Sequence, residues 1–511
     1  MKRLIAFLLV FLLGVTALPL GGVAEETSNT WVEVNDSTVT THGRTFYNDG
    51  YLWFNWTYSG FSFSFYGTSA KGIFRSGEHN NAYLNVYVDG SLVASNTIIL
   101  KGTKKTFTLI EGLPEGEHTI TVRKRTENRG NATAGISHLQ VDGYLLEQLP
   151  QKSQNTIEVI GDSITCGFGN LMDGTYSMGY QAKGQEGTLT FATLATSRFD
   201  AETTVIARSG IGFQYNNGGD TADSMMDVYT QTDYFHNNGQ DWDFAANPSD
   251  LVIIALGTND TSAPSADAFY QGATKFLAKV RKNNPDAIII WAYEVITASY
   301  SNQIKQVVVD ANFEGDDKVF YHSLGLMDKE ADGVGLDGHP TVKTHKKEAN
   351  GLALLIEELT GWKMGPENPS VTLTFQEDFK VRPWKNEMVI VPPSYAGMPL
   401  EDLKKGIVSS PLTFGYYDGR RVGETLTSGL VVLLRQQDFV LDYCMIIVLG
   451  DVTQDGNINA QDALEVLKYT VGKVQLDGIS QASAAVSGGN QITAKDALQI
   501  LRYTVGKITE F

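Results

Sequence analysis

The sequence contains very little cysteine. Only Cys166 and Cys444 occur among 511 residues. Two cysteines cannot supply the disulfide framework of a small secreted domain, and they do not have the spacing of a zinc site. Neither kind of cross-link is therefore expected, and Cys166 is expected to be a packed thiol.

Basic residues are also scarce, and long apolar runs are missing after the N-terminus. The chain has 40 Lys and Arg against 58 Asp and Glu, for a formal net charge of −18. A surface of this sign repels nucleic-acid phosphates and anionic lipids. No later segment reaches the roughly 18 apolar residues that a membrane-spanning helix needs. We therefore expect no nucleic-acid or membrane partner. We also expect a monomer.

The N-terminus has the pattern of a secretory signal peptide. Met1-Lys2-Arg3 precedes a short apolar run at 4–13, and small residues stand at 22 and 24, before two glutamates. The run is too short to cross a bilayer, and no stop-transfer charges follow it, which disfavours the alternative of an N-terminal anchor. We expect residues 1–24 to be removed and the protein to be secreted and extracellular.

The length and the hydrophobic content, 42%, predict several globular modules rather than one domain. Residues 25–150 show short, alternating apolar stretches such as 61–65 and 83–88, which predict a jelly-roll-like β-sandwich. Residues 151–363 instead contain near-continuous apolar strands separated by helix-length segments, the pattern of a doubly wound parallel sheet. These strands are expected at 156–160, 204–207, 251–256, 287–292 and 319–322.

The last third of the chain divides into three parts. Two prolines mark a linker at 364–370, and strand-like runs predict a small β-rich module of unknown role at 371–449. Within 450–511, the segment 462–473 recurs almost unchanged as 496–507. A duplicated short helix predicts a two-part module.

Candidate catalytic residues follow three of the predicted parallel strands. Ser163 follows the first strand in a glycine-rich turn, Gly210 follows the second, and Asn259 follows the third. The carboxyl ends of parallel strands meet at one edge of a sheet, so a nucleophile would lie there beside a backbone N–H and an amide. These are the donors that a tetrahedral oxyanion requires.

A serine nucleophile needs a base, and His339 is the best placed of the eight histidines. It lies in a glycine-rich loop before the last helix of the α/β region, with Asp337 two residues upstream. We expect His339 to accept the proton of Ser163, and Asp337 to orient the imidazole. The short spacing leaves open that Asp337 shares this task with a backbone carbonyl. Such a mechanism needs no cofactor.

These segments, in their order and spacing, resemble the sequence blocks of the SGNH (GDSL-type) hydrolases. The resemblance implies an acyl-enzyme on Ser163 and an oxyanion held by Ser163, Gly210 and Asn259. The preceding sandwich, with its segments 43–44, 87–90 and 116–127, is similar to that of carbohydrate esterase family 2. That resemblance implies removal of O-acetyl groups from plant cell-wall polysaccharides such as acetylated xylan and mannan. Trp242 and Trp291 could stack on sugars, but core packing is favoured for both.

The start of the tail has the pattern of an EF-hand-like calcium loop. Oxygen ligands stand at positions 1, 3, 5, 7 and 12, with glycine at position 6. The expected ligands are Asp451, Thr453, Asp455, Asn457 (through its carbonyl) and Asp462. The repeat resembles a dockerin, which implies a cohesin-bearing cellulosomal scaffold as partner.

The second copy of this loop departs from the pattern. Ala485, Gly489 and Asn490 replace Asp451, Asp455 and Gly456. Its calcium site is therefore expected to be weak or absent.

Two other functions remain open at this point. One is an esterase of another acylated glycan. The other is a non-catalytic glycan-binding scaffold component, which retention of Ser163, Asn259 and His339 together disfavours.

Overall fold

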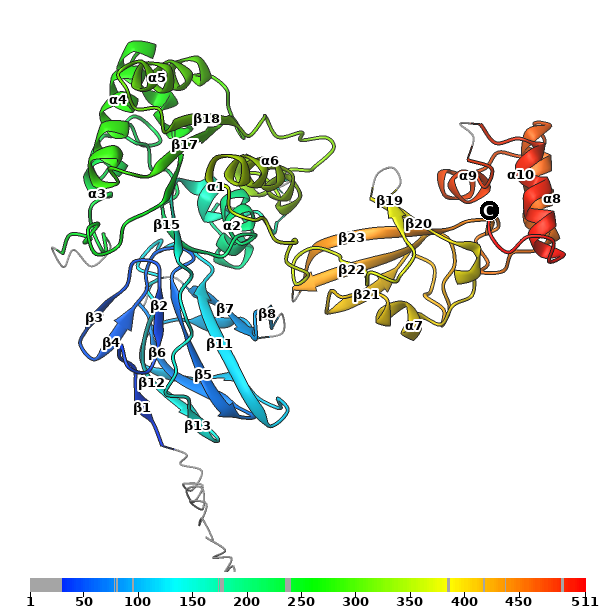
Figure 1. The fold of residues 1–511 in the computed structure, drawn as a ribbon, viewed down its shortest axis with the longest axis horizontal. Helices are drawn as coiled ribbons and strands as arrows, with labels where there is room; N and C mark the ends of the chain where they lie inside the picture. The colour runs from blue at the N-terminus through cyan, green and yellow to red at the C-terminus, as the bar shows by residue number, and fades with distance from the viewer. Residues whose placement is uncertain are drawn as a thin grey trace, which may run out of the picture.

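A computed structural model describes residues 30–511 apart from 78, 80, 94–95, 173, 175–178, 235–239, 384–386, 417–418, 437 and 489–490. The expected signal peptide lies outside the described residues. Four modules follow one another: a sandwich, an α/β domain above it, a β-rich module and a helical tail (Figure 1). No helix in this described part is both long and apolar enough to cross a membrane.

Two antiparallel sheets form the N-terminal sandwich, as the alternating pattern predicts. Phe61, Phe63 and Phe65 point inward from one strand, where they join the core between the sheets. The first sheet contains β1 (Val32–Glu33), β3 (Phe46–Asn48), β4 (Tyr51–Trp53), β6 (Ala70–Arg75), β10 (Lys105–Ile110) and β12 (Gly135–Val141). The second contains β2 (Thr40–His42), β5 (Gly60–Gly67), β7 (Ala82–Val88), β8 (Ser91–Leu92), β9 (Ile98–Leu100), β11 (Gly116–Lys124) and β13 (Tyr144–Leu145).

The second module is the predicted doubly wound α/β domain. Its parallel sheet has the order β15-β14-β16-β17-β18. The strands are β14 (Asn155–Gly161), β15 (Ala201–Ala207), β16 (Leu251–Ala255), β17 (Ile288–Tyr293) and β18 (Val319–Ser323). The helices are α1 (Ser163–Cys166), α2 (Phe191–Thr196), α3 (Met225–Val228), α4 (Ala266–Asn283), α5 (Ser301–Phe313) and α6 (Val342–Thr360).

Helices cover both faces of this sheet, because successive residues of each strand point to opposite sides. Helices α4 and α5 build one core with Val252 and Ile254, whereas α2 and α6 build the other with Leu251 and Ile253. In the described part of the domain there are also four 3-10 turns, namely Ala182–Gly184, Gly187–Leu189, Asn259–Ser262 and Leu336–Gly338.

Two buried ion pairs fix the sandwich against the α/β domain. Arg44 lies 2.9 Å from the Glu158 carboxylate, and Arg125 lies 3.1 Å from that of Glu186. Both arginines come from the sandwich and are fully buried. Removing one partner of such a pair would leave an uncompensated charge in the interior. The contact also brings the sandwich loop 127–131 beside the α/β domain.

A mixed five-stranded sheet with the order β19-β20-β23-β22-β21 forms the third module. Its elements are β19 (Arg382–Pro383), β20 (Met388–Val391), the 3-10 turn Pro393–Tyr395, α7 (Leu400–Lys405), β21 (Leu412–Gly415), β22 (Leu430–Gln436) and β23 (Phe439–Val448). The tail contributes α8 (Ala460–Thr470), α9 (Gly478–Ala484) and α10 (Ala494–Thr504).

The β-rich module and the tail share one hydrophobic core. Met445 and Ile447 of β23 pack with Val466 of α8 and Ile500 of α10, while the alternate residues of β23 pack on the side of α7. Both faces of β23 are therefore covered, and the tail closes one of them.

The β-rich module also contacts the α/β domain. Lys346 of α6 donates to the Leu441 carbonyl at 2.9 Å and lies 3.2 Å from Asp442. In the expected linker, the Gly365 N–H donates to the Arg198 carbonyl at 2.6 Å. The linker is therefore held against the α/β domain, and the module lies between that domain and the tail (Figure 1).

Candidate active site

The three strand-end residues predicted from the sequence meet at one edge of the sheet. Gly161, the last residue of β14, is in register with Ala207 of β15 and with Ala255 of β16. Ser163, Gly210 and Asn259 follow these residues by two to four positions. The sheet therefore places the nucleophile candidate between the two candidate oxyanion donors.

The turn that carries Ser163 requires small and polar neighbours. A Cβ at Gly161 would lie 2.0 Å from the Thr165 hydroxyl, so only glycine fits there. The Asp162 carboxylate accepts the Ile164 N–H at 2.9 Å and caps α1. Burial raises the pKa of Asp162 to about 7. These contacts hold Ser163 at the first position of the helix.

His339 contacts Ser163 directly. Its Nε2 lies 2.8 Å from the Ser163 hydroxyl oxygen, and its Nδ1 lies 3.1 Å from the Leu336 carbonyl oxygen. Because a carbonyl can only accept, Nδ1 carries the proton and Nε2 is free to accept one from Ser163. The Phe168 ring packs on the imidazole at 4.5 Å, and burial lowers the pKa of His339 below its ordinary value.

Nδ1 therefore contacts a backbone carbonyl, and the spacing of Asp337 had left open that such a carbonyl shares the task of orienting the imidazole. Asp337 is exposed, with a left-handed φ of 51°. Its charge still raises the pKa of His339, against the larger effect of burial. The close approach of the histidine loop needs Gly169, since a Cβ there would lie 2.2 Å from Leu336.

The candidate oxyanion donors are held by buried carboxylates. The Asn259 amide donates to the Ile211 carbonyl at 2.9 Å and to Asp162 at 3.3 Å. Gly210 has a φ of +81°, which favours glycine. Asp260 stabilises the chain after Gly210 by accepting three N–H groups, and burial raises its pKa to about 7.

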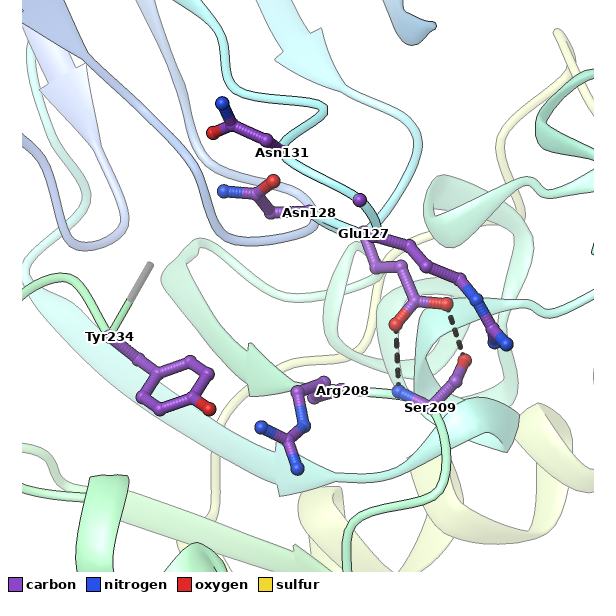
Figure 2. A pocket seen from close by; sticks show the side chains of 8 residues that line it. Glu127, Asn128, Asn131, Arg208, Ser209 and Tyr234 are labelled. Carbon is purple, nitrogen blue, oxygen red and sulfur yellow. Dashed lines mark hydrogen bonds between the residues drawn. The ribbon is translucent and has the colours of Figure 1, made fainter. Parts of the chain in front are cut away.

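The sandwich supplies a contact to this edge that the sequence did not reveal. The Glu127 carboxylate accepts the Ser209 N–H at 2.8 Å and the Ser209 hydroxyl (Figure 2). Ser209 precedes Gly210, so a residue of one domain fixes the oxyanion loop of the other. Glu127 ends the segment on which the sandwich resemblance rests, but nothing in that segment indicates its partner.

Of three other residues named from the sequence, Trp291 and Cys166 are fully buried and Trp242 is half-buried. Trp291 is fully buried and donates to the Leu256 carbonyl at 3.0 Å, while Trp242 packs on Arg44 at 5.2 Å. Burial raises the pKa of the Cys166 thiol well above its ordinary value. A neutral buried thiol is a poor nucleophile.

The five residues of the first tail loop lie together. Asp451 accepts the Asp455 N–H at 3.0 Å, and Asp455 accepts the Asn457 N–H at 2.8 Å. Asp462 accepts the Thr453 N–H and hydroxyl, both at 2.9 Å. Asp451 and Asp462 are both fully buried.

Within the described residues, no three His, Cys, Asp or Glu side chains form a metal cluster. The first loop instead offers carboxylate, hydroxyl and backbone oxygens, the hard donors that suit calcium. In the second loop, Gly489 and Asn490 lie outside the described residues.

Three family models match this chain. Carbohydrate esterase 2 N-terminal matches residues 41–148, GDSL-like lipase/acylhydrolase matches 157–352, and dockerin type I domain matches 449–504. A solved family two carbohydrate esterase from Clostridium thermocellum, in complex with cellohexaose, is 30% identical with a TM-score of 0.59. The alignment covers all of that chain and 64% of this one. The chain belongs to carbohydrate esterase family 2.

Curated relatives agree with this membership. The cellulase/esterase CelE of Acetivibrio thermocellus is 33% identical over 315 residues, which is 58% of this family 2 chain and 36% of CelE. The chain thus spans about a third of the length of that relative. An acetylxylan esterase / glucomannan deacetylase of Cellvibrio japonicus is 25% identical over 351 residues, covering 65% of this chain and 91% of the relative.

Proposed function

We propose that this family 2 protein is a secreted serine esterase that removes O-acetyl groups from hemicellulose. The observation that carries the proposal is the 2.8 Å contact between His339 and Ser163, at the edge where Gly210 and Asn259 also lie. A base paired with a serine hydroxyl beside two oxyanion donors suits acyl transfer. The name of the Cellvibrio relative supports acetylated xylan and glucomannan as substrates.

The proposed reaction has two steps. The Ser163 oxygen attacks the ester carbonyl carbon while its proton moves to Nε2 of His339. The Ser163 and Gly210 N–H groups and the Asn259 amide bind the oxyanion, the last in place of its long bond to Asp162. The sugar hydroxyl leaves with the His339 proton. Water, activated by His339, then releases acetate and restores Ser163.

Acetate release from acetylated xylan and acetylated glucomannan tests this function. We expect both polymers to be deacetylated by the wild-type protein and neither by a Ser163→Ala variant. Binding of both polymers without any acetate release would instead favour the non-catalytic glycan-binding function. If the protein deacylates only a different acylated glycan, its function is that of an esterase of that glycan rather than of hemicellulose.

The pH profile of kcat/KM is expected to fall on its acidic side as His339 becomes protonated. Burial lowers the pKa of His339, so activity should persist at pH values below the ordinary histidine pKa. Asp337→Asn removes a charge that raises this pKa, so the acidic limb should move to lower pH. Asp317→Asn, an exposed change before β18 at the opposite edge of the sheet, is the control and should leave the limb in place. If the acidic limb of the kcat/KM profile of Asp337→Asn lies at the same pH as in the wild-type protein, this interpretation is contradicted.

We propose that the tail binds calcium through Asp451, Thr453, Asp455, Asp462 and the Asn457 carbonyl. Burial raises the pKa of Asp451, and the nearby Asp462 charge adds to this effect. A divalent cation would relieve the repulsion between these two carboxylates. Bound calcium would thereby stabilise the loop that precedes α8.

Chelation is therefore expected to lower the melting temperature of the C-terminal part of the full chain. Calcium at 100 times its Kd would contribute about 2.7 kcal/mol. Differential scanning calorimetry with and without EGTA measures this, and Asp451→Asn should reduce the calcium-dependent difference. A melting curve that chelator leaves unchanged would refute the calcium site.

We further propose that the tail binds a cohesin module of a cellulosomal scaffold. The dockerin match supports this, and the two repeats present exposed apolar side chains at equivalent positions. They are Leu464 and Val471 on one repeat and Leu498 and Val505 on the other. Exposed apolar residues of this kind are typical of protein-binding surfaces.

A further inference from the structure

A groove of about 700 Å³ lies between the sandwich and the candidate active site. The sandwich loop 127–131 forms one wall, and Arg208, Ser209 and Tyr234 form the other (Figure 2). Arg208 and Ser209 lie between β15 and Gly210, so the groove opens at the catalytic edge of the sheet. A glycan chain whose acetyl group lies at Ser163 would extend into such a neighbouring hollow.

Asn128 in this groove has an unsatisfied amide. The residue is only 5% exposed, and within the described residues neither its Nδ2 nor its Oδ1 has a hydrogen-bond partner. A buried amide without partners costs free energy unless a ligand or water satisfies it. An amide both donates and accepts, so a sugar hydroxyl group would satisfy both atoms.

Two guanidinium groups also belong to the groove, although the protein as a whole carries a charge of −18. Arg208 lies over the Tyr234 ring at 5.0 Å, and Arg129 lies over the Tyr180 ring at 5.0 Å. The Arg208 guanidinium also hydrogen bonds the Tyr234 hydroxyl. A guanidinium carries five N–H donors, so other N–H groups of Arg208 can pair with an anion.

The nearby carboxylates are already engaged. Glu127 accepts the Ser209 N–H and hydroxyl and the Gln185 amide. Asp223, beside the groove, is hydrogen bonded to the Tyr234 hydroxyl. The groove therefore combines an unsatisfied amide with the guanidinium of Arg208.

We propose that this groove is a subsite for a carboxylate-bearing sugar, a uronic acid unit of the acetylated glycan. The Asn128 amide binds a hydroxyl group of that unit, and the Arg208 guanidinium pairs with its carboxylate. The inference rests on the proposed esterase function but adds a substrate preference to it. It selects glycans in which acetyl and uronic acid groups occur close together.

The test compares glucuronoxylan with its carboxyl-reduced form, both acetylated chemically to the same degree. The wild-type protein should have a kcat/KM about tenfold higher on the acidic polymer, the factor expected for one charged hydrogen-bonded pair. Arg208→Gln should bring this ratio close to one, whereas Arg208→Lys keeps the charge and should retain part of it. Asn128→Ala should lower kcat/KM on both polymers, because both contain the hydroxyl groups. High salt should lower the wild-type ratio of kcat/KM on the acidic polymer to kcat/KM on the reduced polymer, because it screens the charge pair.

Arg502→Gln, an exposed change on α10 of the tail, is the matched control and should keep the wild-type ratio. Affinity electrophoresis of a Ser163→Ala protein measures the same preference without turnover. If the Ser163→Ala protein binds the acidic polymer preferentially but the wild-type protein releases no acetate, the subsite is supported and the esterase is refuted. Equal binding and equal turnover of the two polymers would overturn the subsite and leave the esterase standing.

Discussion

Replacing Ser163 by Ala is expected to lower kcat for acetate release by about ten-thousand-fold or more. The hydroxyl oxygen is the atom that attacks the ester, and His339 Nε2 at 2.8 Å is positioned to accept its proton. His339→Ala should cause a loss of similar size, because the two residues act as one unit and their effects do not add. Acetate release from acetylated xylan under saturating substrate measures both losses.

Asp337→Ala provides the contrast that tests the geometry. Asp337 is exposed, and the Leu336 carbonyl already holds Nδ1. An exposed charge contributes at most about 1 kcal/mol, so the loss should stay within about fivefold. Ser91→Ala, an exposed serine on β8, is the control for the Ser163 change. A loss in Asp337→Ala as large as in Ser163→Ala would contradict the role of the carbonyl.

The meeting of the candidate site residues at one edge could be predicted from the sequence because these residues follow individual strands. Ser163, Gly210 and Asn259 each come just after a strand, so the topology of a parallel sheet suffices to bring them together. The position of His339 followed from its loop before the last helix. Strand topology therefore predicts the shared edge of the sheet, whereas the distances between the side chains along that edge depend on the rest of the fold.

Contacts to backbone atoms and contacts between modules could not be predicted in this way. Any residue offers a carbonyl, so no residue type at position 336 indicates that Leu336 holds His339. The Glu127–Ser209 contact and the unsatisfied Asn128 amide arise only when the sandwich docks on the α/β domain. One signal was present, however. The continuous apolar run 445–449 is typical of a strand buried on both faces, and the tail covers one of them.

The shared core predicts that the β-rich module and the tail unfold together. Ile447 is fully buried on the face of β23 that packs against α8 and α10. Ile447→Ala should therefore lower the free energy of unfolding of this unit by about 2–5 kcal/mol, the usual cost of such a cavity. Hydrogen exchange measured by mass spectrometry on the full chain should show faster exchange in both 371–449 and 450–511.

Val440→Ala on the same strand is the control, since Val440 is 38% exposed and its loss leaves no cavity. The parallel sheet of the α/β domain should keep its exchange rates in Ile447→Ala, because the cores on its two faces contain no residue of β23. Strand β23 contacts that domain at Leu441, which packs with Val342 of α6. Faster exchange confined to β20, β22 and β23, with α8 and α10 unchanged, would show that the tail folds independently. Shared loss of protection would mean that the β-rich module supports the tail, and that a cohesin bound there is connected to the α/β domain through folded contacts rather than through a free linker.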